Sequence, residues 1–236
     1  MNFKNRSYTL ELLDNDVIPQ KDLYQNLREL DFINQWLGGH QVVLAGLHYF
    51  LEKSRAIKPV SILEIGSGGG DNLRAIGRFL HKKNIPYHLQ GVDLKNDCVQ
   101  FARQHQNIPI QYQVCDYQLT DLTLQKPDYI FNSLFCHHFK EPDLINMLQW
   151  MYKHSEKGFF IADLHRHPLA YYSIKILTGL FSKSYLVRND APLSVLRGFR
   201  KTDWEILLDQ AQIKNYKIRW KWAFRWLIIV EKPTIH

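Results

Sequence analysis

The stretch Leu63-Glu64-Ile65-Gly66-Ser67-Gly68-Gly69-Gly70-Asp71 decides the fold of this 236-residue chain. It joins the end of an apolar run that is typical of a buried strand to an amphipathic pattern that is typical of a helix. The glycines between them allow a tight turn and let a ligand approach the backbone without a side chain intervening. We therefore expect a ligand-binding loop that connects a strand to a helix.

Strand patterns alternate with helix patterns outward from this loop. Two helices are expected before it, over residues 23–37 and 42–51, and further helices follow several of the strands. Pro142 indicates the start of one of these, and Thr202 with Glu205 forms a capping-box pattern that starts another. The expected strands cover residues 61–65, 88–93, 110–115, 129–134 and 159–162, with an antiparallel pair at 217–220 and 225–230. This alternation predicts an α/β fold, with a doubly wound, mostly parallel sheet of seven strands.

The composition narrows the class of protein without selecting a function. A hydrophobic fraction of 45% with 22% charged residues excludes wholesale disorder, and the length suits one domain. The net charge of +7 is compatible with a nucleic acid, an anionic surface or an acidic small molecule. In the closing hairpin, basic residues alternate with tryptophans, which on a strand places the tryptophans inward and the bases outward.

The cysteines and the apolar stretches indicate in which cellular compartment the protein resides. Cys98, Cys115 and Cys136 form no CxxC pair, and the first residues lack the apolar run of a secretory signal. The most apolar stretches, 169–181 and 226–230, are too short or too interrupted to span a bilayer. We therefore expect a cytoplasmic protein without a disulfide framework and without a membrane partner.

Three acidic residues define the kind of ligand that the glycine loop accepts. A dinucleotide-binding GxGxxG motif would place its third glycine at position 71, where this chain has Asp71. An aspartate at a helix start repels a pyrophosphate, so a cofactor with an ammonium or sulfonium group fits better. Asp93 ends the second strand, where a carboxylate can accept both hydroxyls of a ribose. Asp116 ends the third strand and is placed to accept a hydrogen bond from an adenine amino group.

With these motifs the chain resembles the class I S-adenosylmethionine-dependent methyltransferases, of a bacterial small-molecule type, from about Lys58 to Ala162. The resemblance implies a Rossmann-like sheet with an antiparallel last strand and S-adenosylmethionine as the cofactor. It implies an amino-acid pocket at the glycine loop, the ribose at Asp93, the adenine at Asp116, and the methionine moiety beside the end of strand four. The implied cofactor residues are Glu64, Gly66, Ser67, Gly68, Gly70, Asp93, Leu94, Asp116, Tyr117, Asn132, Ser133 and Leu134.

The chain is expected to form a single methyltransferase domain over residues 1–236. Within it we expect an N-terminal helical lid at 1–57, a cofactor-binding core at 58–163, a cap insertion at 164–201, and a closing helix and β-hairpin at 202–236. The cap is apolar on nearly every side, so it is either covered by the body or lines a site for the acceptor. In the second case its aromatic residues bury a lipophilic or aromatic acceptor.

Methyl transfer to a hydroxyl needs a base, for which a histidine is suited. His138 follows the fourth strand and His165 the fifth, both at the edge of the sheet where ligands bind, and His40 is a third candidate. Arg166 could orient an acidic acceptor or stabilise a phenolate. Each of these residues also has a structural interpretation, since His137 or His138 could pack under the cofactor or cap a loop. His165 and Arg166 could equally be a loop histidine and a surface ion pair.

Three other functions remain open at this point. A methyltransferase of RNA or DNA bases would also be basic, but the stretch Asn132-Ser133-Leu134-Phe135 lacks the prolines and the tyrosine of the motif used for exocyclic amines. A non-catalytic S-adenosylmethionine-binding protein would keep the same motifs, and a dehydrogenase is disfavoured by Asp71. His165 and His167 lack a further ligand cluster, so no metal is expected. The sequence thus favours methylation of a small-molecule acceptor, most readily at a hydroxyl, and leaves homo-oligomerisation open.

Overall fold

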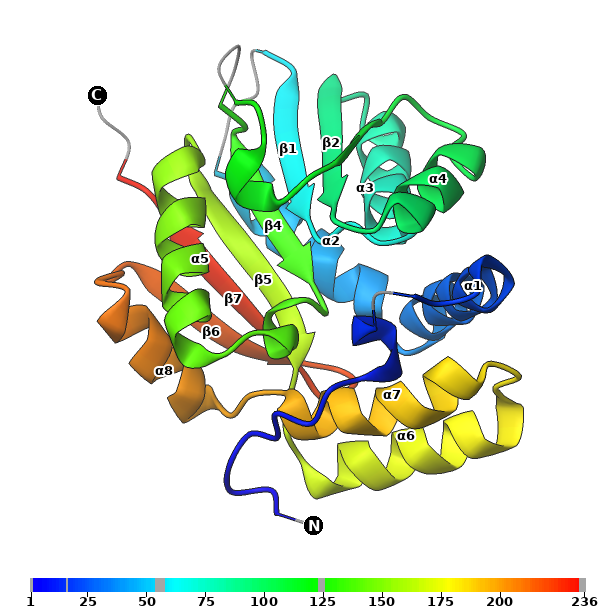
Figure 1. Cartoon of the computed structure of the whole chain (residues 1–236). Coiled ribbons are helices and arrows are strands. Elements are labelled where there is room, and N and C mark those ends of the chain that lie inside the picture. The colour runs from blue at the N-terminus through cyan, green and yellow to red at the C-terminus, as the bar shows by residue number, and fades with distance from the viewer. Residues whose placement is uncertain (1, 16, 54–57, 123–125, 234–236) are drawn as a thin grey trace.

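The computed structural model describes residues 2–15, 17–53, 58–122 and 126–233. These residues form a seven-stranded sheet in the order β3-β2-β1-β4-β5-β7-β6, with helices on both faces (Figure 1). Only β7 runs antiparallel to its neighbours, β5 and β6. The strands are β1 (Val60–Ile65), β2 (Tyr87–Asp93), β3 (Gln111–Val114), β4 (Tyr129–Ser133), β5 (Gly158–Leu164), β6 (Tyr216–Lys221) and β7 (Arg225–Glu231). The predicted doubly wound sheet is therefore confirmed.

Two groups of helices cover the sheet, and a third group lies beyond its carboxyl edge. The helices α2 (Gly39–Leu51), α3 (Asp71–Lys82) and α4 (Asn96–Gln104) pack on one face. The helices α5 (Glu141–His154) and α8 (Lys201–Gln210) pack on the other. The remaining helices are α1 (Gln20–Trp36) and the cap helices α6 (Pro168–Phe181) and α7 (Tyr185–Arg197). In Figure 1 these three lie together at the end of the sheet where the central parallel strands finish.

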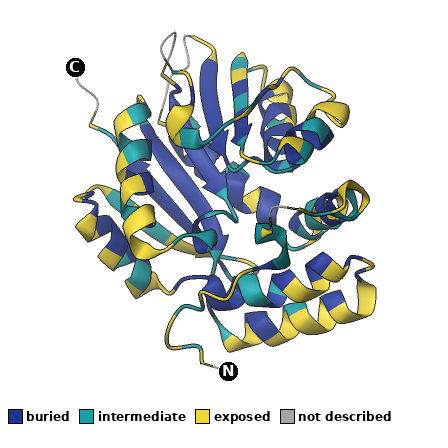
Figure 2. Cartoon of the chain, viewed as in Figure 1, coloured by how far each residue is buried: buried dark blue, intermediate teal, exposed yellow. Residues whose placement is uncertain are grey.

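The central strands are buried on both faces, as Figure 2 shows in dark blue. Every residue of β1 is buried, because helices cover it on each side and no face is left to solvent. This explains why β1 carries apolar residues on both of its faces rather than in an alternating pattern. The glycine loop thus follows a strand that is buried along its whole length.

The helix α8 begins differently from the sequence prediction. The predicted capping box of Thr202 and Glu205 is wrong, because the N-cap is Arg200 and the backbone N–H of Arg200 donates to Oδ2 of Asp203 at 2.8 Å. The side chain of Glu205 instead pairs with Lys201, at 3.0 Å. The first turn therefore starts earlier in the chain than the motif suggested.

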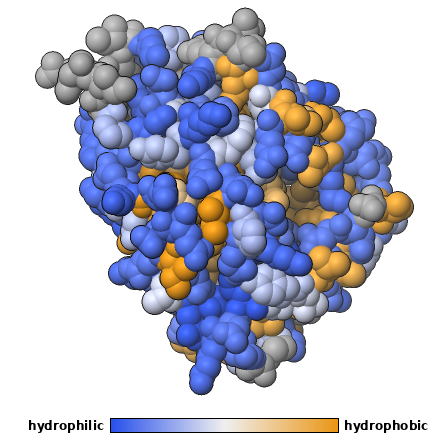
Figure 3. All heavy atoms as spheres, turned by 60° about the vertical axis from the view of Figure 1, so that its left-hand side comes forward, coloured by the Kyte–Doolittle hydropathy of each residue, from blue (hydrophilic) through white to orange (hydrophobic). Residues whose placement is uncertain are grey.

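The prediction that the tryptophans of the hairpin lie inward and its basic residues outward is correct for Trp226, which is buried, and wrong for Trp220, Trp222 and Arg225. Trp220 and Trp222 are exposed, whereas Arg225 is only 4% exposed. The cause is position in the sheet, because β6 is an edge strand and β7 is covered on both faces. Figure 3, with the side of α5 and α8 turned forward, shows a largely hydrophilic surface with separate apolar patches.

The cap helix α6 was expected to be covered or to line a site, and it is buried on one side only. Ala170 and Tyr171 of α6 are buried, but an outer apolar face of the helix is open to solvent. The exposed apolar residues of α6 are Leu169, Tyr172, Ile176, Leu177, Leu180 and Phe181. Among the described residues, no helix has both the length and the apolar character needed to cross a membrane.

Candidate functional site

The glycine loop turns sharply because two of its residues adopt left-handed backbone conformations against close neighbours. Gly66 has a φ of +69°, and a Cβ there would lie 2.2 Å from the ring of Phe135. Gly70, the N-cap of α3, has a φ of +73°, and a Cβ would lie 2.1 Å from the hydroxyl of Tyr112. At Gly68 a Cβ would meet no atom within 4 Å, so this backbone is open toward a ligand. The loop is a cradle for a bound group.

A cavity of about 780 Å³ lies over this loop. The ends of β2, β3 and β4 and the helix α1 complete its wall, which fits ligand binding beyond the carboxyl ends of the strands. Nine of the predicted cofactor residues line it: Gly66, Ser67, Gly68, Asp93, Leu94, Asp116, Tyr117, Ser133 and Leu134. Three others, Glu64, Gly70 and Asn132, lie behind the wall. Asp71, which the sequence places at the start of the helix after the loop, also lines the cavity, as do Asp14, Asn34 and Asn72, which no sequence motif indicated.

The pKa values of the two carboxyl groups beside the loop shift in opposite directions because their surroundings differ. Burial raises the pKa of Glu64 well above its usual range, and the charge of Asp71 adds to this effect. Burial also acts on Asp71, but the hydrogen bond and charge of His40, 2.8 Å away, hold the Asp71 pKa below its usual range. Burial therefore favours the protonated form of Glu64, whereas His40 favours the ionised form of Asp71 on the cavity wall.

Asp93 joins the glycine loop to the next strand. Its Oδ2 accepts from the N–H of Gly68 at 2.8 Å, and its Oδ1 accepts from the N–H of Lys95 at 2.9 Å. Burial nevertheless raises its pKa, and these hydrogen bonds offset only part of that effect. The carboxylate therefore both orders the loop and faces the cavity.

Unpaired polar atoms indicate what the cavity can accept. Within the described parts of the chain, the buried Oγ of Ser67 and Oδ1 of Asn72 have no hydrogen-bond partner, and both residues line the cavity. Buried polar groups are rarely left unpaired in native proteins, so a polar ligand is expected beside them. With the ionised Asp71 and the carboxylate of Asp93, this donor and acceptor set fits a zwitterionic amino acid joined to a ribose.

A second cavity, of about 370 Å³, opens beside the first. Its wall comes from α1, α6, α7 and the turn between β6 and β7, and it is largely apolar. The two cavities share the residues Leu13, Leu30, Asn34, Leu134 and His138. Leu134 has a φ of +52°, which is uncommon for a branched residue and is typical of functional sites. The lining residues of α6 are small or aliphatic, so the aromatic wall expected from the cap comes instead from Trp222 and Phe224.

Two adjacent histidines stand at the junction, each paired with a carboxylate. Nδ1 of His138 lies 2.8 Å from Oδ1 of Asp14. Nδ1 of His137 lies 2.8 Å from Oδ1 of Asp163, and its Nε2 lies 3.6 Å from Glu11. His137 is buried and lines the second cavity only, whereas His138 is partly exposed and lines both.

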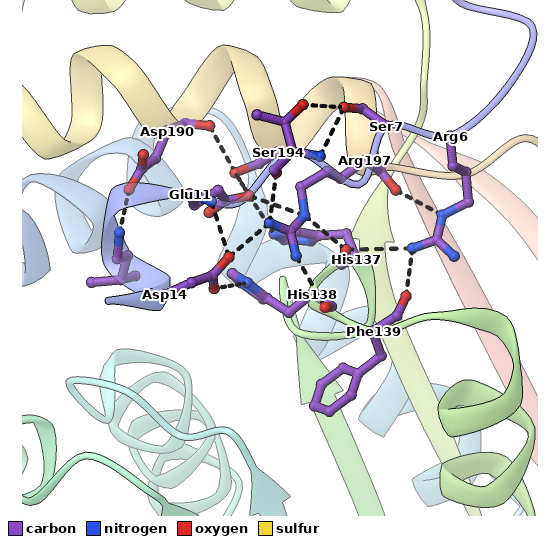
Figure 4. Close-up of polar contacts among 12 residues, drawn as sticks. Arg6, Ser7, Glu11, Asp14, His137, His138, Phe139, Asp190, Ser194 and Arg197 are labelled. Carbon is purple, nitrogen blue, oxygen red and sulfur yellow. Dashed lines mark hydrogen bonds and ion pairs between the residues drawn. The ribbon is translucent and has the colours of Figure 1, made fainter. Parts of the chain in front are cut away.

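The carboxylates of the N-terminal segment reach the histidines because arginines bind its backbone (Figure 4). Arg197 donates to the carbonyl oxygens of Thr9, His137 and His138, and pairs with Asp14 at 2.7 Å. Burial raises the pKa of Asp14, but the hydrogen bond and charge of His138 outweigh it, so the Asp14 pKa lies well below its usual range. We call residues 3–14 the N-terminal strap, and its acids were missed because nothing near them in the sequence points to this contact.

Two predicted catalytic residues, His165 and Arg166, line neither cavity. His165 contacts Trp226 and His167, and burial lowers its pKa to about 4. Arg166 donates to the carbonyl oxygens of Phe3, Lys4 and Gly198 and pairs with Asp203 at 2.9 Å. The geometry gives these residues positions that suit structural roles. His40, which binds Asp71, also lies outside both cavities.

The central part of the chain matches a family of known proteins. Residues 62–158 match the family model described as "Methyltransferase domain". The mitochondrial ubiquinone biosynthesis O-methyltransferase of Saccharomyces cerevisiae (strain ATCC 204508 / S288c) is 29% identical over 119 residues. That match covers 48% of this chain and 36% of the yeast protein, so the chain corresponds to a part of its relative.

Solved structures resemble nearly the whole chain. The plantazolicin methyltransferase BpumL in complex with SAH superposes with a TM-score of 0.66 at 16% identity, over 91% of this chain and 95% of that chain. Human N-acetylserotonin methyltransferase in complex with SAM superposes with a TM-score of 0.62 at 18% identity, over 92% of this chain and 57% of that chain. Magnesium protoporphyrin IX methyltransferase from Synechocystis PCC 6803 with bound SAH superposes with a TM-score of 0.55 at 12% identity, over 83% of this chain and 84% of that chain. At these identities the likeness shows a shared fold.

Proposed function

Since this chain belongs to the class I S-adenosylmethionine-dependent methyltransferases, we propose that it methylates a hydroxyl of a small apolar or aromatic acceptor. The larger cavity takes S-adenosylmethionine and the smaller takes the acceptor. The observation that carries this proposal is that both cavities share Leu134 and His138. In-line transfer requires the two reacting atoms at close range, and a shared wall supplies that geometry. The name of the yeast relative, an O-methyltransferase, supports a hydroxyl as the target.

The cofactor's parts match the polar groups of the larger cavity. When bound, S-adenosylmethionine supplies an electrophilic methyl group on a sulfonium. Asp93 accepts the ribose hydroxyls, and Asp116 with Tyr117 frames the adenine. The ionised Asp71 attracts the ammonium group, and Ser133 with Leu134 borders the methionine chain. Glu64, which lies behind the wall, acts through Asn72, whose Nδ2 donates to Oε1 of Glu64 at 2.9 Å.

His138 is the proposed general base. Its Nδ1–H donates to the ionised Asp14, which leaves Nε2 as an acceptor for the proton of the acceptor hydroxyl. The Asp14 carboxylate then stabilises the imidazolium that forms, while Arg197 keeps Asp14 in position. Among the described residues, Nε2 of His138 has no hydrogen-bond partner, so it is free to accept the proton of a hydroxyl.

His137 is a weaker candidate for the same role. Its imidazole is enclosed between Asp163 and Glu11, and it does not line the cofactor's cavity. We assign it the positioning of the junction, together with Arg197, which binds the carbonyl oxygens of both histidines. Neither His165 nor Arg166 is carried into the mechanism, because both lie outside the two cavities.

The proposal extends to partners and location. A largely apolar cavity of about 370 Å³ suits a small molecule rather than a base presented on a nucleic acid strand. Methylation of RNA or DNA, and cofactor binding without turnover, are the competing functions.

The three free cysteines suit a reducing compartment such as the cytoplasm, which fractionation of cells would test.

A direct test uses S-adenosylmethionine labelled in its methyl group. The purified chain is incubated with the labelled cofactor and, separately, with a panel of small phenols and with total RNA. Transfer of label to a phenol, lost in His138→Gln with cofactor affinity retained, supports the proposal. Label in RNA alone, or tight cofactor binding with no labelled product from the panel or from extracted metabolites, would refute it.

A further inference from the structure

We propose that the acceptor carries a carboxylate in addition to the hydroxyl that is methylated, and that Arg225 in the second cavity binds this carboxylate. The inference deepens the proposed function and rests on it for the location of the acceptor. It is carried by the hydrogen bonds, the charge and the position of one buried arginine.

Arg225 begins β7 and lines the second cavity, not the cofactor's cavity. Its side chain has few partners for a buried guanidinium. Nη1 donates to the carbonyl oxygens of Leu37 at 2.8 Å and Ala223 at 3.3 Å. Nη2 makes one long contact, of 3.4 Å, to Oδ1 of Asn34. Nε is buried and has no hydrogen-bond partner among the described residues.

The unused donors lie on one edge of the guanidinium. Nε–H and one N–H of Nη2 point the same way, and this edge matches the two oxygens of a carboxylate. Such bidentate pairing is stronger and more specific than a contact with a single carbonyl oxygen. The Nη1 side, by contrast, is occupied by the two carbonyl oxygens and holds the side chain in place.

The charge of Arg225 is also uncompensated. In the described part of the chain, no carboxylate lies within 4.0 Å of its guanidinium, whereas Arg166 and Arg197 each have an acidic partner. Burial lowers the pKa of Arg225 to about 10, and the charge of Asp163 raises it only in part. The Asp163 oxygens already accept from His137 and from the N–H of Leu164. A buried charge without a partner is destabilising, and a ligand carboxylate would remove that cost.

The other charged groups of this cavity are engaged elsewhere. Glu11 accepts from Ser194 at 2.8 Å, and Asp190 accepts from the N–H groups of Leu12 and Leu13. Both acids belong to the wall formed by the N-terminal strap and α7, whereas Arg225 belongs to the wall formed by β7 and the end of α1. Among the described residues of this cavity wall, Arg225 is thus the only cationic group without an acidic partner. The carboxylate of the acceptor would bind there.

Matched pairs of ligands provide the test, with SAH bound so that no turnover occurs. The pairs are 4-hydroxybenzoate with 4-hydroxybenzamide, 4-hydroxyphenylacetate with its amide, and 4-hydroxycinnamate with its amide. In at least one pair the wild-type protein should bind the acid about 10- to 100-fold more tightly than the amide, as a charge-assisted bidentate contact implies. Calorimetry measures both dissociation constants.

Three variants separate recognition from folding. Arg225→Gln should reduce the preference to about twofold or less, and Arg225→Lys should retain part of it because the charge remains. Arg219→Gln, on the exposed side of the neighbouring strand, is the matched control and should keep the full preference. SAH affinity and the melting temperature report whether each variant keeps its fold.

Several outcomes overturn the inference. They are equal binding of acid and amide in every pair, binding of none of the acids, or a preference that survives in Arg225→Gln. A loss of cofactor affinity in Arg225→Gln with an unchanged preference would assign the arginine to the carboxylate of the cofactor instead. Failure of the proposed function is distinguishable, because it would appear as acid-selective binding without methyl transfer to the hydroxyl.

Discussion

Replacing Asp93 by asparagine should weaken binding of S-adenosylmethionine while leaving the fold intact. Each carboxylate oxygen of Asp93 accepts one backbone N–H, from Gly68 at 2.8 Å and from Lys95 at 2.9 Å. An oxygen of a carboxylate has two acceptor positions, so one on each oxygen remains for a ribose hydroxyl. Asparagine has the same shape but places an NH₂ group where one oxygen accepted, opposite a backbone donor.

The size of the effect follows from the lost contacts. Hydrogen bonds to a charged group contribute about 1.5–3 kcal/mol, so loss of the charged acceptor should raise the dissociation constant roughly 10- to 150-fold. Because burial raises the pKa of Asp93, acidification should weaken cofactor binding to the wild-type protein before it protonates ordinary carboxylates. The asparagine variant should lack this component of the pH dependence.

Calorimetric titration of S-adenosylmethionine at several pH values measures both effects. Asp209→Asn, an exposed substitution on α8, is the control and should bind the cofactor as the wild-type protein does. The melting temperature of each variant shows whether the loop change has spread to the core. An unchanged dissociation constant in a folded Asp93→Asn protein would refute the assignment of the ribose to this residue.

Three further predictions concern other parts of the site. His138→Gln should lower turnover about 10²- to 10⁴-fold at saturating cofactor, while His165→Gln, outside both cavities, should not; equal rates for the two variants would contradict the choice of base. Burial raises the pKa of Glu11 from 4.5 to about 7 in the folded protein. The protonated side chain therefore contributes about 3 kcal/mol to the free energy of unfolding below pH 4.5, and this contribution is lost as the pH rises through 7. Glu11→Gln should remove that pH dependence in urea unfolding, and an identical slope would count against it. Gly66→Ala should destabilise the protein more than Gly68→Ala, since both have positive φ but only Gly66 faces a ring at 2.2 Å; equal melting temperatures would disprove this.

The sheet and the cofactor loop could be predicted because their signals are local. The apolar residues of β1, the glycines after it and the acid that ends β2 all lie between residues 60 and 93, and the glycines themselves indicate the backbone conformation of the turn. The errors arose where neighbours in space decide the environment. Arg225 follows the alternation of an exposed hairpin, but its strand lies inside the sheet, and only the strand order shows this.

The proposed catalytic junction between the two cavities was less accessible to sequence reasoning, because its parts come from distant segments. His138 was a candidate by its place after a strand, but its partner Asp14 lies 124 positions away in the chain. His165 follows a strand in the same way, yet its ring packs against Trp226. Position at the sheet edge thus selects both histidines equally, and only the packing of the strap and cap distinguishes them.

The basic excess of the chain has a structural use at this junction. Arg166 and Arg197 are buried, and both donate mainly to main-chain carbonyl oxygens, including those of Phe3, Lys4 and Thr9 in the strap. These contacts hold the strap by its backbone, and the side chains of Arg6 and Tyr8 add hydrogen bonds outside the cavities, to Glu141 and, from Arg6, to the carbonyl oxygen of Arg197. Arg197 also binds the carbonyl oxygens of both junction histidines, so removal of its side chain should disturb the strap and the proposed base together. Loss of turnover in an Arg197 variant would therefore identify a positioning residue only if mild variants, such as Arg197→Lys, lower turnover more than they lower stability.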